Sequence, residues 1–109
     1  MTEPHGLPDG SNFFSSVRGG AGAEAVRDAY ARAGWSVRAC GRAEWEAASP
    51  FAELVVEGAD PVLVHGAVAD IVRNAERAVA PLSEAGIPFH AECYGADGAL
   101  LAELRWTPG

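Results

Sequence analysis

Two stretches of the chain match each other, AGWSVRA at residues 33–39 and AGIPFHA at residues 85–91. Further along, Ala52-Glu53-Leu54 is matched in the same order by Ala102-Glu103-Leu104. Each half reads as a helix, an Ala-Gly stop, a strand, a connection and a second strand. Self-similarity in a fixed order is typical of a duplicated structural unit. The sequence therefore predicts two related halves, residues 22–57 and residues 60–107.

The clearest local signal is a hairpin in the second half. Residues 88–96 and 99–106 alternate apolar and polar side chains on either side of Asp97-Gly98. That dipeptide favours a two-residue turn, because both turn positions take a positive φ. The turn predicts a register in which Phe89 faces Trp106 and Glu92 faces Glu103.

Two amphipathic helices are predicted. The first covers residues 22–33, where apolar side chains recur with helical spacing and Gly34 provides a stop. The second is expected to begin at Asp60-Pro61, with Asp60 as the N-cap and Pro61 in the first turn. Its apolar stripe runs to Leu82, Pro81 should kink or interrupt the helix, and Gly86 closes it.

The remaining segments are expected to be strands, a connection and a tail. Residues 35–42 and 51–57 are predicted strands, joined by a connection over residues 43–50. Residues 1–20 are rich in proline and glycine, which favours an irregular tail, and residues 21–109 are expected to form a single domain. Phe13 and Phe14 are the exceptions in this tail. They would either pin it onto the domain or act as a hook for a partner.

These elements predict an α+β two-layer sandwich. Each helix and each strand has one apolar face that must be buried. A four-stranded antiparallel sheet with two helices on one face buries all of them. A right-handed crossover gives the strand order 1-2-4-3. This αββαββ order resembles a circularly permuted ferredoxin-like fold. It would hide Leu54 and Leu104 beneath the helices and bring Glu53 close to Glu103.

The other face of this sheet would be open, and alternation along the strands predicts which residues lie on it. They are Arg38, Cys40, Phe51, Glu53, Val55, Glu57, His90, Glu92, Tyr94, Leu101, Glu103 and Arg105. The apolar members suggest that something covers the face, such as a second copy, the tail or a partner. Trp45, in the connection over residues 43–50, is expected to be exposed and to anchor an interface.

The hairpin register opposes like charges on this face, Glu92 to Glu103 and His90 to Arg105, which is unfavourable. One interpretation is a carboxylate cluster that binds a cation or a basic group, or that moves a proton. The other is diagonal pairing of the carboxylates with His90 and Arg105 on a solvated face. No metal is predicted, because the candidate ligands Cys40, His90, Glu92 and Glu103 lie on different strands without diagnostic spacing.

Composition narrows the class of protein. The 109 residues carry a formal charge of −7, and all eight of the Lys and Arg residues are arginine, a bias typical of a GC-rich bacterial genome. This charge opposes binding to nucleic acid and to anionic membranes. It either selects a basic partner or only maintains solubility. With no signal peptide or membrane span recognised, and with Cys40 and Cys93 expected to be free thiols, a cytoplasmic protein is predicted.

The function expected from these features is binding without catalysis. A small acidic module would recognise a basic protein, as immunity proteins or inhibitors do, or would dimerise with its own copy through the open face. One alternative is a small enzyme with His90, Glu92 and Glu103 as acid/base groups. Another is a dimeric ligand-sensing regulatory module. No cofactor is predicted.

Overall fold

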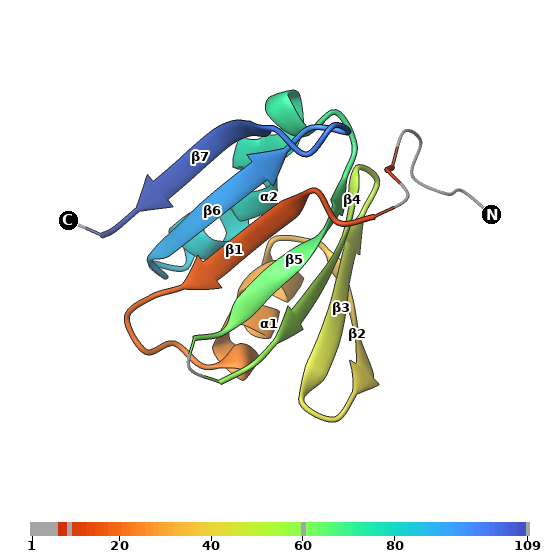
Figure 1. The fold of residues 1–109 in the computed structure, drawn as a ribbon. Coiled ribbons are helices and arrows are strands. Elements are labelled where there is room, and N and C mark those ends of the chain that lie inside the picture. The colour runs from red at the N-terminus through yellow and green to blue at the C-terminus, as the bar shows by residue number, and fades with distance from the viewer. Residues whose placement is uncertain (1–6, 9, 60, 109) are drawn as a thin grey trace.

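Seven strands form one antiparallel sheet in the computed structural model of this chain, which describes residues 7–8, 10–59 and 61–108. The sheet order is β2-β3-β4-β5-β1-β6-β7 (Figure 1). The elements follow along the chain as β1 (Phe13–Val17), α1 (Ala23–Arg32), β2 (Ser36–Gly41), β3 (Glu44–Ser49), β4 (Ala52–Glu57), β5 (Leu63–Val68), α2 (Ile71–Glu84), β6 (Phe89–Tyr94) and β7 (Leu100–Trp106).

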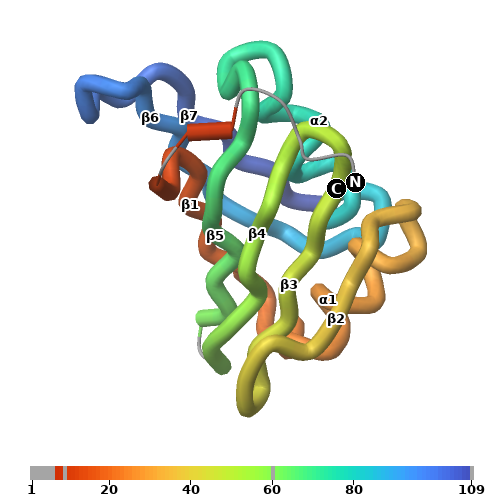
Figure 2. Tube along the Cα trace, turned by 90° about the vertical axis from the view of Figure 1, so that its right-hand side faces the viewer, coloured from red at the N-terminus to blue at the C-terminus, as the bar shows by residue number. Residues whose placement is uncertain are grey.

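Both helices lie on the same side of the sheet, so the molecule has two layers (Figures 1 and 2). The core fills the space between them. Alternate residues of each central strand point into it, as Ala52, Leu54 and Val56 do on β4. Tyr30 of α1 links the two helices, because its buried hydroxyl donates a hydrogen bond of 2.6 Å to the Ala78 carbonyl of α2. Burial raises the pKa of this phenol far above its usual range.

The prediction of a four-stranded, permuted ferredoxin-like sheet is wrong, because the sheet has seven strands. The α+β composition and the placement of both helices on one face were predicted correctly. The additional strands are β1, β3 and β5. For each of these segments, a different structure was predicted from the sequence.

Strand β1 comes from the segment expected to be an irregular tail. It lies between β5 and β6, and its residues Phe13, Ser15 and Val17 are buried on the helix side. The buried Ser15 hydroxyl, which has no hydrogen-bond partner among the described residues, breaks the apolar alternation that identifies a strand. The expectation of an irregular tail over residues 1–6 and 9 lies outside the described residues.

Strand β5 comes from the first part of the predicted second helix. Val64 and Val68 are four residues apart, a spacing that suits a helix face and also one face of a strand. Pairing with β4 and β1 on both sides selects the strand. Helix α2 begins only at Ile71 and continues through Pro81 to Glu84. The predicted N-cap Asp60 lies outside the described residues.

Strand β3 comes from the predicted connection between two strands. The chain reverses at Arg42 and Ala43, where Ala43 takes the left-handed φ of +59° that is unusual for a residue with a Cβ. Neither central position of this turn is glycine, asparagine or aspartate. The segment therefore looked like a long loop, although it pairs with both β2 and β4.

The predicted duplication holds only where each helix ends. Gly34 and Gly86 follow α1 and α2 with positive φ, and a strand begins soon after each. Beyond that point the halves differ, because β3 is inserted before the matching Ala-Glu-Leu segment of β4. Strand β4 is third in the sheet, whereas β7 is at an edge. Three strands therefore separate Glu53 from Glu103, and the predicted approach of these two carboxylates is wrong.

The hairpin register is confirmed. Phe89 pairs with Trp106, Glu92 with Glu103 and His90 with Arg105. The turn itself differs from the prediction, because Gly98 has a positive φ and Asp97 does not. The Gly98 amide donates a hydrogen bond to the Gly95 carbonyl. A bulge beside Tyr94 then restores the predicted pairing further along the strands. Leu54 is buried beneath the helices as expected, and Leu104 is half-buried.

Candidate functional site

The face of the sheet opposite the helices is uncovered by any described element, and we call it the open face. Its centre is formed by β5, β1 and β6, two of which the sequence did not predict as strands. Phe14 on β1 pairs with His65 on one side and with Glu92 on the other. Ser16 likewise pairs with Leu63 and with His90. The register therefore brings residues from three distant segments into one patch.

Aromatic and apolar side chains occupy this centre. The Phe14 ring stacks on His65 with 6.4 Å between ring centroids, and it meets the Tyr94 ring edge-on at 5.8 Å. Phe14 is 43% exposed and Leu63 is 41% exposed. Beside them is a depression of about 210 Å³, also lined by Ser16 and Glu92. A cluster of solvent-exposed apolar side chains is typical of a surface that binds a ligand or another protein.

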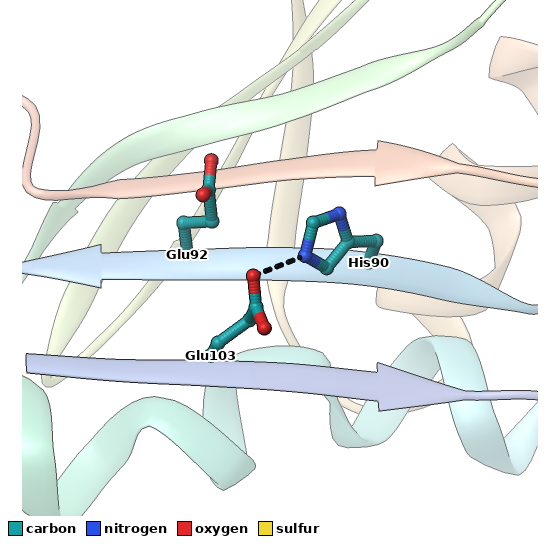
Figure 3. Close-up of side chains that lie close together, drawn as sticks. All are labelled: His90, Glu92 and Glu103. Carbon is teal, nitrogen blue, oxygen red and sulfur yellow. Dashed lines mark hydrogen bonds and ion pairs between the residues drawn. The ribbon is translucent and has the colours of Figure 1, made fainter. Parts of the chain in front are cut away.

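A cluster of charged side chains lies beside the aromatic centre, on β6 and β7 (Figure 3). His90 Nε2 and Glu103 Oε2 are 2.9 Å apart, and Arg105 Nη2 is 3.7 Å from the other carboxylate oxygen. The hydrogen bond to His90 is the main reason that the pKa of Glu103 lies below its ordinary value. The diagonal pairing of Glu103 with His90 is thus present, and it relieves part of the repulsion between Glu92 and Glu103.

These three residues, His90, Glu92 and Glu103, also have the chemistry of metal ligands. One ligand atom from each lies within 4.8 Å of the others, and all three side chains are on the same face of adjacent strands. An imidazole with two carboxylates suits a divalent transition metal. Cys40, the fourth candidate ligand, is on β2 at the opposite edge of the sheet. The absence of a metal, predicted from the sequence, stays a prediction.

Other predicted residues of this face lie on β2 and β4, in the half of the sheet away from β6 and β7. Arg38 on β2 bonds to Glu46 on β3 at 3.0 Å, and this bond raises the pKa of the Arg38 guanidinium. Glu57 on β4 bonds to His65 at 3.0 Å, while Val55 pairs with His65 across the strands. Glu53 is exposed on the same strand. These residues share the open face but do not form one continuous cluster with His90, Glu92 and Glu103.

Two predicted members of the interface, Trp45 and Phe51, lie on the helix side. Trp45 pairs with the buried Val56, and the Arg27 guanidinium of α1 lies 5.0 Å from its ring. The Phe51 ring packs edge-on against Trp35 and lies 4.2 Å beneath the guanidinium of Arg77. Both expectations are wrong. Trp45 belongs to an unpredicted strand, and Phe51 precedes β4, outside its alternation.

Leu101 and the two cysteines complete the predicted set. Leu101 lies at the bulge of β7 and lines a cavity of about 680 Å³ near the start of α2, together with Tyr94 and Val72. Both cysteines are free, Cys40 exposed and Cys93 buried in the core. Burial raises the pKa of the Cys93 thiol, which makes it a poor nucleophile.

The ion pair between His90 and Glu103 predicts a measurable titration. Replacing His90 with alanine should raise the carboxyl pKa of Glu103, because the hydrogen bond that stabilises its charged form is lost. The lowered pKa contributes to stability above the ordinary value of 4.5, and this contribution is lost as pH falls through the folded-state pKa. Carbon-detected NMR titration of the glutamate side chains measures the pKa of Glu103 in the unmodified chain and in the variant. An unchanged Glu103 titration in the His90→Ala variant would show that this hydrogen bond is absent in solution.

Comparison with protein-family models, curated proteins and solved structures finds no match for this chain. Within the described residues, no helix has the length and apolar character needed to cross a membrane.

Proposed function

We propose that this protein is a binding module that recognises a basic protein surface through the open face of its sheet. The observation that carries the proposal is the composition of that face. An aromatic and apolar centre, in which Phe14 and Leu63 are exposed and Tyr94 is half-buried, is bordered by the carboxylates of Glu57, Glu92 and Glu103. Interfaces commonly combine aromatic anchors at their centre with a charged rim.

Charge indicates the kind of partner. The chain carries a net charge of −7, so its long-range field attracts basic proteins and repels acidic ones. On the open face, Glu92 pairs across the strands with Phe14 and Glu103, and no salt bridge to it is found among the described residues. An arginine of a partner could therefore bond to Glu92 while its neighbouring apolar residue contacts Phe14.

Binding of a designed peptide tests this proposal. The probe is a labelled peptide of alternating arginine and leucine, and fluorescence anisotropy follows its binding to the full chain. The double variant Glu92→Gln and Glu103→Gln should weaken binding roughly tenfold, mainly through a slower association and a smaller dependence on salt. Phe14→Ser should instead accelerate dissociation, because the central apolar contact is lost.

The matched control changes the same number of charges on the other side of the molecule. Glu24 and Glu84 are exposed on the helices, and their double replacement by glutamine should leave binding within roughly twofold of the unmodified chain. Equal binding of a glutamate-leucine peptide would rule out a basic partner. Equal losses in the two double variants would show that net charge, rather than the open face, attracts the peptide.

A further inference from the structure

Strand β7 is an edge of the sheet, with no described strand paired to its outer side. Edge strands direct unpaired N–H and C=O groups outward, and proteins usually blunt such edges with charges, bulges or proline. In the other edge strand, β2, a bulge between Ala39 and Gly41 limits the regular stretch to residues 36–39. In β7 the bulge lies at the beginning, so residues 102–106 form a regular stretch that is open to pairing.

The helix side of β7 is also incompletely covered. A groove of about 470 Å³ runs between α2 and β7, and it is lined in part by Val79, Phe89, Leu104 and Trp106. Leu104 and Trp106 are only half-buried, although they pack against the core. Apolar surface therefore continues from the core to the free edge of the sheet.

The sequence of this edge is complementary to itself. In an antiparallel pair of β7 strands related by a two-fold axis at Leu104, each Glu103 lies opposite the partner's Arg105. The same register places Leu104 opposite the partner's Leu104 and the small Ala102 opposite the partner's Trp106. Opposite charges meet on the open face, and apolar side chains meet on the helix side. An isologous contact of this kind is the usual basis of a symmetric dimer.

We infer that a second copy of this chain pairs with β7 about Leu104 and extends the sheet across the dimer. The exposure of Glu103 and Arg105 suits this contact, although Glu103 also bonds to His90 within the chain. The Glu103 side chain is 40% exposed and that of Arg105 is 71% exposed, and the two are only loosely paired within one chain at 3.7 Å. Because the axis is perpendicular to the sheet, both open faces lie on the same side of the dimer and form one larger surface.

Charge reversal at this edge tests the inference. Sedimentation velocity of the full chain should show, as concentration rises, a species of twice the 11.3 kDa chain mass. Arg105→Glu should weaken the dimer at least roughly tenfold, because two like-charge contacts replace two favourable ones. The double variant Glu103→Arg and Arg105→Glu should recover dimerisation to within roughly threefold of the unmodified chain, since each contact is again between opposite charges.

Arg38→Glu is the matched control, because it makes the same charge change at the opposite edge of the sheet and should leave the dimer unchanged. Circular dichroism and thermal melting establish that each variant is folded. A chain that stays monomeric, or a folded double variant that does not recover, would overturn the inference. So would a dimer that Phe14→Ser disrupts and Arg105→Glu does not, since that result would place the interface on the open face.

Discussion

Replacing Phe13 with alanine should lower the free energy of unfolding by about 3–5 kcal/mol, the range for truncating a buried phenylalanine. Phe13 is fully buried on β1, where it pairs with Gly66 of β5 and Cys93 of β6. Its side chain therefore fills the middle of the core, and the truncation leaves a cavity between the sheet and the helices. Urea denaturation followed by tryptophan fluorescence measures the loss.

The adjacent residue provides the control for this prediction. Phe14 has the same side chain but points to the open face, so Phe14→Ala should cost less than about 1 kcal/mol. A slip of one residue in the pairing of β1 would exchange the two side chains between the faces. If Phe14→Ala were the more destabilising variant, the register of β1 would be wrong, and with it the centre of the open face.

Replacing Gly66 with alanine should be comparably severe, with a loss of at least about 3 kcal/mol or no folded protein. A Cβ at this position would collide with the carbonyl oxygen of Glu53 and would lie 2.9 Å from the Cα of Leu54. Both atoms belong to the backbone of β4, so relief requires β4 and β5 to separate in the middle of the sheet. Thermal unfolding monitored by circular dichroism measures the change.

Gly34→Ala is the control that separates the steric collision expected at Gly66 from the free-energy cost of placing a Cβ on a residue with positive φ. Gly34 has a φ of +94°, yet a Cβ there meets no atom within 4 Å. The substitution should therefore cost only about 1–2 kcal/mol, the penalty for a Cβ in the left-handed region. Equal losses at the two glycines would mean that β4 and β5 are not packed as closely as the structure has them.

Elements whose signals are local were predicted from the sequence. Helix α1 was expected over residues 22–33 and covers Ala23–Arg32, because its apolar stripe and Gly34 lie within one short segment. The β6–β7 register was also predicted, since Asp97-Gly98 and two alternating strands determine it together. The opposition of Glu92 and Glu103 followed from that register. All of this information is contained within about one helix or one hairpin of chain.

Elements whose conformation depends on distant partners were not predicted. The segment from Val62 to Val68 satisfies helical and strand periodicity equally, and its pairing with β4 and β1 decides between them. Strand β1 has only a weak apolar alternation, and pairing with β5 on one side and β6 on the other holds it in place. The Asn12 side chain bonds to both backbone groups of Val68, and the Asn12 carbonyl accepts from the Tyr94 amide.

The open face shows the same division. His90, Glu92, Tyr94, Glu103 and Arg105 were identified because one hairpin holds them. Ser16, Leu63 and His65, which help to complete the centre, were missed because they belong to β1 and β5. Phe14 was singled out as a possible hook for a partner but was not placed on this face, for the same reason. Phe51 was assigned to the wrong side of the sheet, and Trp45 was placed in an exposed connection instead of a strand. A side chain's face follows from its strand's register, and register is unknown until the strand is recognised.

The sequence by itself determined the acidic charge, the amphipathic α1, the glycine stops and the hairpin that carries the charged cluster. Only the tertiary structure decided the number of strands, the central place of β1 and the edge position of β7. The physical reason is that hydrogen bonds in a sheet join residues far apart in the chain. Their free energy can select a strand where local preference is weak or favours a helix.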